Sequence, residues 1–371
     1  MTNLLHPPAS FPPIEHEKRL RALVKILRKQ KLDGAVVASE TARFYYTGFA
    51  ASSGLLLVEP DGKPRFLTDF RYLPAAQKHI PFAECADILR PPESEKLLAQ
   101  LTAKWKRAGI EHTLPHDRFL KFTEPLAHVA EWADLAPAVA AQRAVKSPRE
   151  LKAVRRSAAL NDVVFKQILD NIAAPGVTEW RLRVMMRMII QCAGEAESFA
   201  SIAAFGANAA ECHHAPGEAP LRRNQAVLLD FGTTRNHYCS DLTRTFCLGK
   251  PSKTLAEIHA VVLRANRAAA EKIRPGMTGA EADAIARGVI EKAGYGKAFG
   301  HGLGHGVGLE VHEGPSLSST STQKLEPGNI ITIEPGIYLP GVTGVRIEDI
   351  ALVTEDGCEV LSNAPRELIH G

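Results

Sequence analysis

Two apolar segments that contain acidic residues constrain the fold of this chain more than any other feature. In "AVLLDFGTTRNHYCSDLTRTF", Asp230 directly follows three aliphatic residues, and Asp241 lies near a second apolar run. An unpaired charge is costly inside such a strand. A hairpin whose turn is centred between Arg235 and Asn236 places Asp230 opposite Asp241, with Cβ atoms about 5 Å apart. The sequence therefore predicts two facing carboxylates.

A second segment, "NIITIEPGIYLPGVTGVRIEDIALV", repeats this arrangement. Glu334 ends one apolar run, and Glu348 lies in the strand-like run that follows. Gly341 is at the midpoint between them, in a sequence typical of a turn. We therefore expect a second hairpin that places Glu334 opposite Glu348.

Four carboxylates gathered in one core would repel one another unless cations held them. For any single acid, exposure to solvent or pairing with an arginine is the simpler interpretation. Four acids on two similar hairpins favour a metal site instead. Clusters rich in carboxylate oxygen suit divalent ions, and bridging carboxylates suit two ions about 3.5–4 Å apart.

The glycine-rich stretch "GHGLGHGVGLEVHEGP" adds His301, His305 and His312. The first two have the spacing of a helical zinc motif, but each alternating glycine would weaken a helix by about 1 kcal/mol. The period of two predicts a strand instead, in which His301 and His305 stand about 13 Å apart. They cannot then bind the same ion, which leaves one as a candidate ligand and the other for the substrate.

The segment "GANAAECHHAPGEAP" is predicted to be a loop ahead of the strand that contains Asp230. A histidine in a loop is usually an ordinary surface residue. Loops are also the usual place for a proton-transfer group, so His213 and His214 are both candidates.

The length of 371 residues predicts two domains. We place them at residues 1–142 and 143–371. Helical and strand-like patterns alternate in the first, with helices expected at 17–30, about 93–108 and about 124–134. A capping box at Ser147 and Glu150 predicts the start of a long helix that runs to about residue 172, and Thr178 is a candidate N-cap of the next helix.

Composition excludes several function classes. The net charge of +4 is small and the basic residues are scattered, so no nucleic-acid partner is expected. No long apolar run or signal-peptide pattern is present, so no membrane partner is expected. The six cysteines form no CxxC pair, which is typical of reduced thiols in a cytoplasmic protein.

Four motifs, "DFGTTRNHYCSDLTRTF", "GHGVGLEVHEGP", "ITIEPGIY" and "GVRIEDIALVT", resemble those of the pita-bread metallopeptidases: aminopeptidase P, prolidase, creatinase and methionine aminopeptidase. The first third, with "FYYTGF" and "TDFRYLPAA", is similar to the creatinase/prolidase N-terminal domain, which methionine aminopeptidases lack. The resemblance implies an α+β fold, with a pita-bread C-terminal catalytic domain and a smaller α/β creatinase-like N-terminal domain.

The resemblance also implies a dinuclear metal centre with five ligands: Asp230, Asp241, His305, Glu334 and Glu348. Asp241 and Glu348 would bridge both ions, Asp230 would complete one ion, and His305 with Glu334 would complete the other. Mn²⁺ is the expected metal, with Co²⁺ or Zn²⁺ as alternatives.

Other residues resemble the family's catalytic and substrate-binding groups. Glu334 would also be the general base, and His213 would assist proton transfer. His312 would contact the scissile bond and the substrate, and His301 would help to shape the proline pocket. Arg346 lies two residues from Glu348 on the same strand face, where it would pair with the ligand carboxylates and orient them.

The function implied is a metallo-aminopeptidase that hydrolyses the N-terminal Xaa-Pro bond of proline-containing peptides. The alternative is an Xaa-Pro dipeptidase (prolidase), which needs a group to bind the carboxylate of a dipeptide. A non-catalytic pita-bread binding module is a third possibility, disfavoured because such modules usually lack ligands. A homodimer is expected from the resemblance. "NHYCSD" departs from the family pattern, having Asn-His where many relatives have Gly before the Tyr.

Overall fold

The computed structural model describes residues 13–88, 90–171, 173–193 and 196–369. The chain divides into two compact units, with the boundary between Arg143 and Ala144. No helix in these described ranges is long and apolar enough to cross a membrane.

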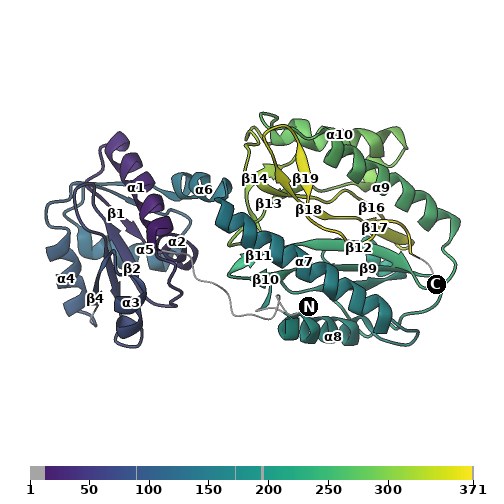
Figure 1. Cartoon of the computed structure of the whole chain (residues 1–371), viewed down its shortest axis with the longest axis horizontal. Helices are drawn as coiled ribbons and strands as arrows, with labels where there is room; N and C mark the ends of the chain where they lie inside the picture. Colours follow the sequence, from purple (N-terminus) through teal and green to yellow (C-terminus); the bar gives the residue numbers. More distant parts are fainter. Residues whose placement is uncertain (1–12, 89, 172, 194–195, 370–371) are drawn as a thin grey trace. The chain divides into compact units, whose positions relative to one another are not determined.

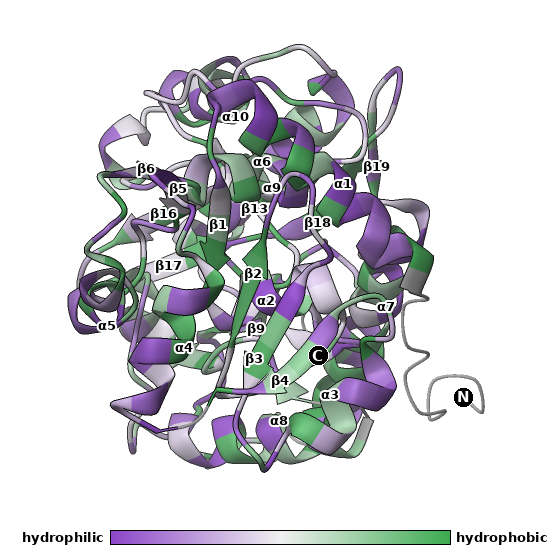
Figure 2. Cartoon of the chain, turned by 90° about the vertical axis from the view of Figure 1, so that its left-hand side faces the viewer, coloured by the Kyte–Doolittle hydropathy of each residue, from purple (hydrophilic) through white to green (hydrophobic). Residues whose placement is uncertain are grey.

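The N-terminal unit is an α/β domain built on a six-stranded mixed sheet, with strand order β4-β3-β2-β1-β5-β6. Its strands are β1 Gly34–Val37, β2 Leu55–Val58, β3 Arg65–Thr68, β4 Glu84–Asp87, β5 Arg107–Ile110 and β6 Glu131–Asp134. Its helices are α1 Pro13–Gln30, α2 Glu40–Thr47, α3 Leu73–His79, α4 Glu93–Leu101, α5 His116–Thr123 and α6 Ala136–Ala144. The central strands are the hydrophobic part of this unit (Figure 2), and all residues of β1 and β2 are buried.

Two predicted helices of this unit are partly wrong. The pattern at 93–108 is helical only to Leu101 and ends in β5, while that at 124–134 ends in β6. Strand β5 pairs in parallel with both β1 and β6. Short apolar runs do not distinguish a buried strand from a helix, and here pairing in the sheet decides between them.

The described residues of the C-terminal unit form four long helices and several small sheets. The helices are α7 Pro148–Asn171, α8 Glu179–Ala193, α9 Lys253–Lys272 and α10 Gly279–Lys292. The strands up to residue 247 are β7 Ala196–Glu197, β8 Ile202–Phe205, β9 Ala226–Phe231, β10 Thr233–Arg235, β11 Tyr238–Cys239 and β12 Leu242–Cys247. The later strands are β13 Gly304–Gly306, β14 Glu313–Leu317, β15 Ile330–Ile333, β16 Gly336–Leu339, β17 Thr343–Arg346, β18 Asp349–Val353 and β19 Cys358–Val360.

The helix starts follow the predicted caps. The backbone N–H of Ser147 donates to the Glu150 carboxylate, and the N–H of Glu150 donates to the Ser147 hydroxyl. The Thr178 hydroxyl accepts from the N–H of Arg181. These bonds confirm the capping box and the second N-cap, because they satisfy N–H groups that have no partner within the helix.

Strand β9 is buried on both faces. Ala226 and Leu228 pack into a core with α9 and α10, whereas Val227, Leu229 and Phe231 pack into a second core with α7 and α8. Figure 1 shows these helix pairs on opposite sides of the strands. This double burial explains the continuous apolar run "AVLL" that precedes Asp230.

The first hairpin forms, but its register differs from the prediction. Asp230 pairs with Thr243 instead of Asp241, because the turn is the two-residue Asn236–His237, one residue later than expected. Both turn residues have positive φ, 52° and 65°, as the usual two-residue hairpin turn requires. The register moves by two residues, so Asp241 keeps its face of the sheet.

The second hairpin has the predicted register. Strand β16 pairs Gly336 with Arg346, and β15 pairs Ile333 with Asp349, so the pairs on both sides of Glu334 and Glu348 follow the expected alignment. Gly341, at the predicted turn centre, has a φ of +73°. Glu334 lies between β15 and β16, and Glu348 lies between β17 and β18.

A close backbone contact joins this hairpin to the loop that begins at the 3₁₀ turn η2, Gly206–Ala210. A Cβ atom on Gly344 of β17 would lie 1.9 Å from the carbonyl oxygen of Ala209. Only glycine fits at this position without displacing backbone.

Replacing Gly344 with alanine should therefore destabilise the protein by about 1–3 kcal/mol, the usual cost of overpacking. Gly288→Ala is the matched control: it lies inside α10 and has open space around it, so it should stabilise the helix by up to about 1 kcal/mol. Thermal unfolding of both variants tests this. Equal melting temperatures for Gly344→Ala and the natural chain would contradict the steric argument.

Candidate metal centre

One pocket of about 390 Å³ in the C-terminal unit collects the residues singled out from the sequence. Nine of the ten candidates line it, all except His214: Asp230, Asp241, His213, His301, His305, His312, Glu334, Arg346 and Glu348. They come from the two hairpins, the glycine-rich stretch and the loop after η2, so segments far apart in the chain meet here.

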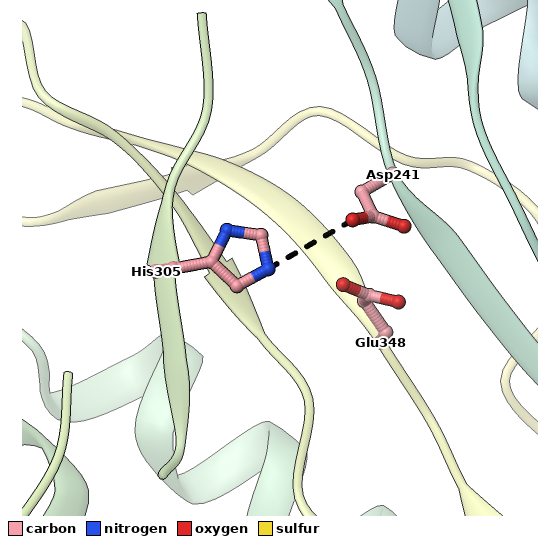
Figure 3. Close-up of side chains that lie close together, drawn as sticks. All are labelled: Asp241, His305 and Glu348. Atoms are coloured by element: carbon pink, nitrogen blue, oxygen red, sulfur yellow. Dashed lines mark ion pairs between the residues drawn. The ribbon is translucent and has the colours of Figure 1, made fainter. Parts of the chain in front are cut away.

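Asp241, His305 and Glu348 form the tightest group. Each offers a ligand atom, and these atoms lie within 4.8 Å of one another. Figure 3 shows the imidazole and the two carboxylates directed toward a common point. The His305 Nε2 is 3.9 Å from an oxygen of Asp241. A nitrogen and two carboxylates at this separation are suitable ligands for a divalent cation.

Asp230 is held by Arg346. The guanidinium Nη2 lies 2.6 Å from Asp230 Oδ2, and Nε donates to the hydroxyl of Thr243 at 3.0 Å. That hydroxyl in turn donates to Glu348 Oε2 at 2.7 Å. Arg346 therefore connects side chains of the two hairpins.

The carboxylates of the pocket repel one another. Burial, followed by the charges of Glu348 and Asp230, raises the pKa of Asp241 well above its usual value. Burial and the charges of Glu334 and Asp230 do the same to the pKa of Glu348. Asp230 Oδ1 and Asp241 Oδ1 are buried and have no hydrogen-bond partner among the described residues. Bound cations would satisfy both the charges and these oxygens, so the residues present fit a metal centre.

Glu334 and His305 form a pair beside this group. Glu334 Oε1 lies 3.3 Å from His305 Nε2 and accepts a hydrogen bond from the hydroxyl of Thr332. Burial would raise the pKa of Glu334, but the hydrogen bond and charge of His305 outweigh it and lower the pKa. Glu334 is therefore held as a carboxylate.

Tyr338 is a pocket neighbour that the sequence interpretation missed. Its hydroxyl lies 2.8 Å from His301 Nε2 and 2.9 Å from Arg346 Nη1. It therefore links His301 to the arginine that holds Asp230. No periodicity in the sequence identifies Tyr338, because both contacts depend on how separate segments pack.

Of the three histidines of the glycine-rich stretch, His305 and His312 contact each other, and His301 has other partners. His301 contacts Tyr338, whereas His305 lies in β13, and its ring is 4.4 Å from that of His312. The strand predicted for the whole stretch is limited to Gly304–Gly306. Other lining residues not identified from the sequence are Phe199, Ile202, Cys212, Gly302, Gly304, Ser316 and Ser318.

The structure separates the two loop histidines. His213 lines the pocket. His214 instead lies between two carboxylates, with Nε2 2.8 Å from Glu179 and Nδ1 2.8 Å from Glu211. Of the two, His213 is the one placed to reach a substrate.

Comparison with known families agrees with this geometry. Residues 152–355 match the model of metallopeptidase family M24, and residues 19–145 match that of the creatinase/prolidase N-terminal domain. The two matches correspond to the two compact units.

Individual relatives are similar over nearly the whole chain. An Xaa-Pro dipeptidase of Pyrococcus furiosus is 32% identical, covering 95% of this chain and 100% of that protein. The solved structure of an Xaa-Pro dipeptidase from Bacillus anthracis has a TM-score of 0.90 at 35% identity, covering 96% of this chain and 100% of that one. That of an X-Pro aminopeptidase from Thermotoga maritima has a TM-score of 0.86 at 28% identity, covering 95% and 99%. The chain therefore belongs to metallopeptidase family M24, and within it to the pita-bread enzymes of the aminopeptidase P and prolidase type.

Proposed function

We propose that this metallopeptidase is an Xaa-Pro dipeptidase, which hydrolyses the bond before the proline of a dipeptide. The observation that carries the proposal is the convergence of four acids and four histidines on one pocket. The names of the relatives favour the dipeptidase over the aminopeptidase that we placed first from the sequence.

Five residues would hold two divalent ions: Asp230, Asp241, His305, Glu334 and Glu348. Four carboxylates and one imidazole suit Mn²⁺, and we keep it as the proposed metal. When bound, the ions would polarise the scissile carbonyl and lower the pKa of the attacking water. A homodimer and a cytoplasmic location complete the proposal.

The protein's own side chains would then position the substrate and move protons. Glu334 is a carboxylate at the edge of the acid group, suited to accept a proton from the attacking water. His213 and His312 line the same pocket, where each can donate to the substrate carbonyl oxygen or to the departing nitrogen. His301 is fixed by Tyr338 and would contact the proline ring.

A specific observation favours the aminopeptidase as the second candidate. Arg346 is the sole lysine or arginine among the described residues that line the pocket, and it is already engaged by Asp230, Thr243 and Tyr338. The C-terminal carboxylate of a dipeptide is usually recognised by a free cation or a set of N–H and O–H donors. Ser316 and Ser318 also line the pocket, but the Ser316 hydroxyl already donates to that of Ser318. A longer peptide does not need such a set of donors.

Removing one central acid tests the metal centre. Asp241→Asn should lower the bound Mn²⁺ per chain and abolish Xaa-Pro hydrolysis, because it removes one negative charge and one ligand atom from the closest group. Metal analysis of the purified protein and a peptidase assay measure the two effects.

The control for this test is Asp356→Asn, an exposed residue outside the pocket, which should leave both readouts unchanged. Full activity of Asp241→Asn with two bound ions would contradict the assignment.

Matched substrates distinguish the two peptidases. With Mn²⁺ present, a dipeptidase should cleave Ala-Pro with a kcat/KM at least about tenfold above that for Ala-Pro-Ala, a difference of about 1.4 kcal/mol. Ala-Pro amide, which lacks the carboxylate, should be as poor a substrate as the tripeptide. The reverse order would establish the aminopeptidase, and failure to cleave all three would overturn the proposed function.

A further inference from the structure

The carboxylate of Glu179 is buried at the start of α8, outside the pocket, and is surrounded by donors. Its side chain is fully buried. Oε1 accepts from the N–H of Phe205 and the amide of Asn208, and Oε2 accepts from the N–H of Gly217 and from His214. A buried carboxylate is tolerated when it is paired and fully hydrogen-bonded in this way. Three of the four donors belong to the loop that contains His213.

His214 is the charged partner. Its two ring nitrogens each lie 2.8 Å from a carboxylate oxygen, one of Glu179 and one of Glu211. A carboxylate only accepts hydrogen bonds, so both nitrogens must carry protons, whichever way the ring is turned. Burial lowers the pKa of His214, but the hydrogen bonds to Glu211 and Glu179 outweigh it and raise the pKa. His214 and the buried Glu179 therefore form an ion pair.

The residues just before His214 face the opposite way, into the pocket. Cys212 and His213 both line it, and the carbonyl oxygen of Cys212 accepts from Arg346 Nη1 at 3.4 Å. His213 thus lies between Cys212, whose carbonyl oxygen accepts from Arg346, and His214, which is bound to Glu179. The start of the loop also rests on β17, at the Gly344 contact.

We propose that His214 is a positioning residue for the reaction: its pair with Glu179 holds the loop of residues 206–217 so that His213 faces the substrate. The exposed bond to Glu211 contributes little, because the Glu211 side chain is 70% exposed and exposed ion pairs are weak. The catalytic part of this inference rests on the proposed function, whereas the anchoring of the loop does not.

Hydrogen exchange tests the anchor without reference to activity. In His214→Gln and Glu179→Gln, the amides of residues 206–217 should exchange faster, because the bonds that Glu179 accepts from Gly217 and the loop side chains are weakened. Glu211→Gln is the matched control: it removes the other carboxylate from the same ring and should leave the exchange of Gly217 unchanged. Unchanged exchange in His214→Gln and Glu179→Gln would overturn the anchor, as would equally fast exchange in Glu211→Gln.

Kinetics test the positioning. His214→Gln should lower kcat by about tenfold, part of the 10²–10⁴ that a placed proton-transfer group contributes, with KM changed less than about twofold. A double-mutant cycle tests whether His214 acts through His213. When His213→Ala is already present, adding His214→Gln should lower kcat no further. An additional tenfold loss in that background would show that His214 acts by another route and would overturn its role as a positioning residue for His213.

Failure of the proposed function can be distinguished from failure of the positioning role of His214. If the natural chain cleaves no Xaa-Pro peptide with Mn²⁺ bound, the proposed function fails, and hydrogen exchange still decides whether Glu179 and His214 hold the loop. If the natural chain is active and His214→Gln has its full kcat, the positioning role fails and the proposed function stands.

Discussion

Repulsion among buried carboxylates is the constraint on which the rest of the C-terminal unit depends. Burial and neighbouring carboxylates raise the pKa values of Asp230, Asp241 and Glu348, and Arg346 is the one permanent cation among the described lining residues. Desolvated charges are tolerated only when the surrounding structure is stable enough to hold them. The two cores on either side of β9 provide that stability, because they fix the strand that carries Asp230 from both faces.

The same constraint explains the polar side chains around the acids. Thr243 links Arg346 to Glu348, and Thr332 joins the backbone of His305 to Glu334. Thr243 lies on β12 and Thr332 on β15, and both are buried. Their hydroxyls fix the direction of a ligand side chain, which limits how far the acids can move apart to relieve their repulsion.

Sequence reasoning recovered those parts of the site that depend on pattern and charge. Gly341 marks the turn of the second hairpin, and the register of that hairpin is the predicted one. The first hairpin was misaligned because Asn236 and His237 adopt positive φ, which the residue types permit but do not dictate. Side-chain networks were less accessible: neither the Tyr338 link nor the Glu179 pair follows from periodicity, since each depends on how distant segments pack. The roles assigned to the individual ligands remain predictions.

The contact between the two hairpins has a consequence for chain entropy. Arg346 and Asp230 are 116 residues apart in sequence, and Thr243 and Glu348 are 105 apart. A cation bound by Asp241 and Glu348 would close the same long loop, as a disulfide does, but reversibly. Closing a loop of this size costs little more than closing one half as long, about 0.6 kcal/mol. Bound metal would then act as a removable crosslink in the C-terminal unit. The free energy of unfolding of this unit would rise with the concentration of free ion.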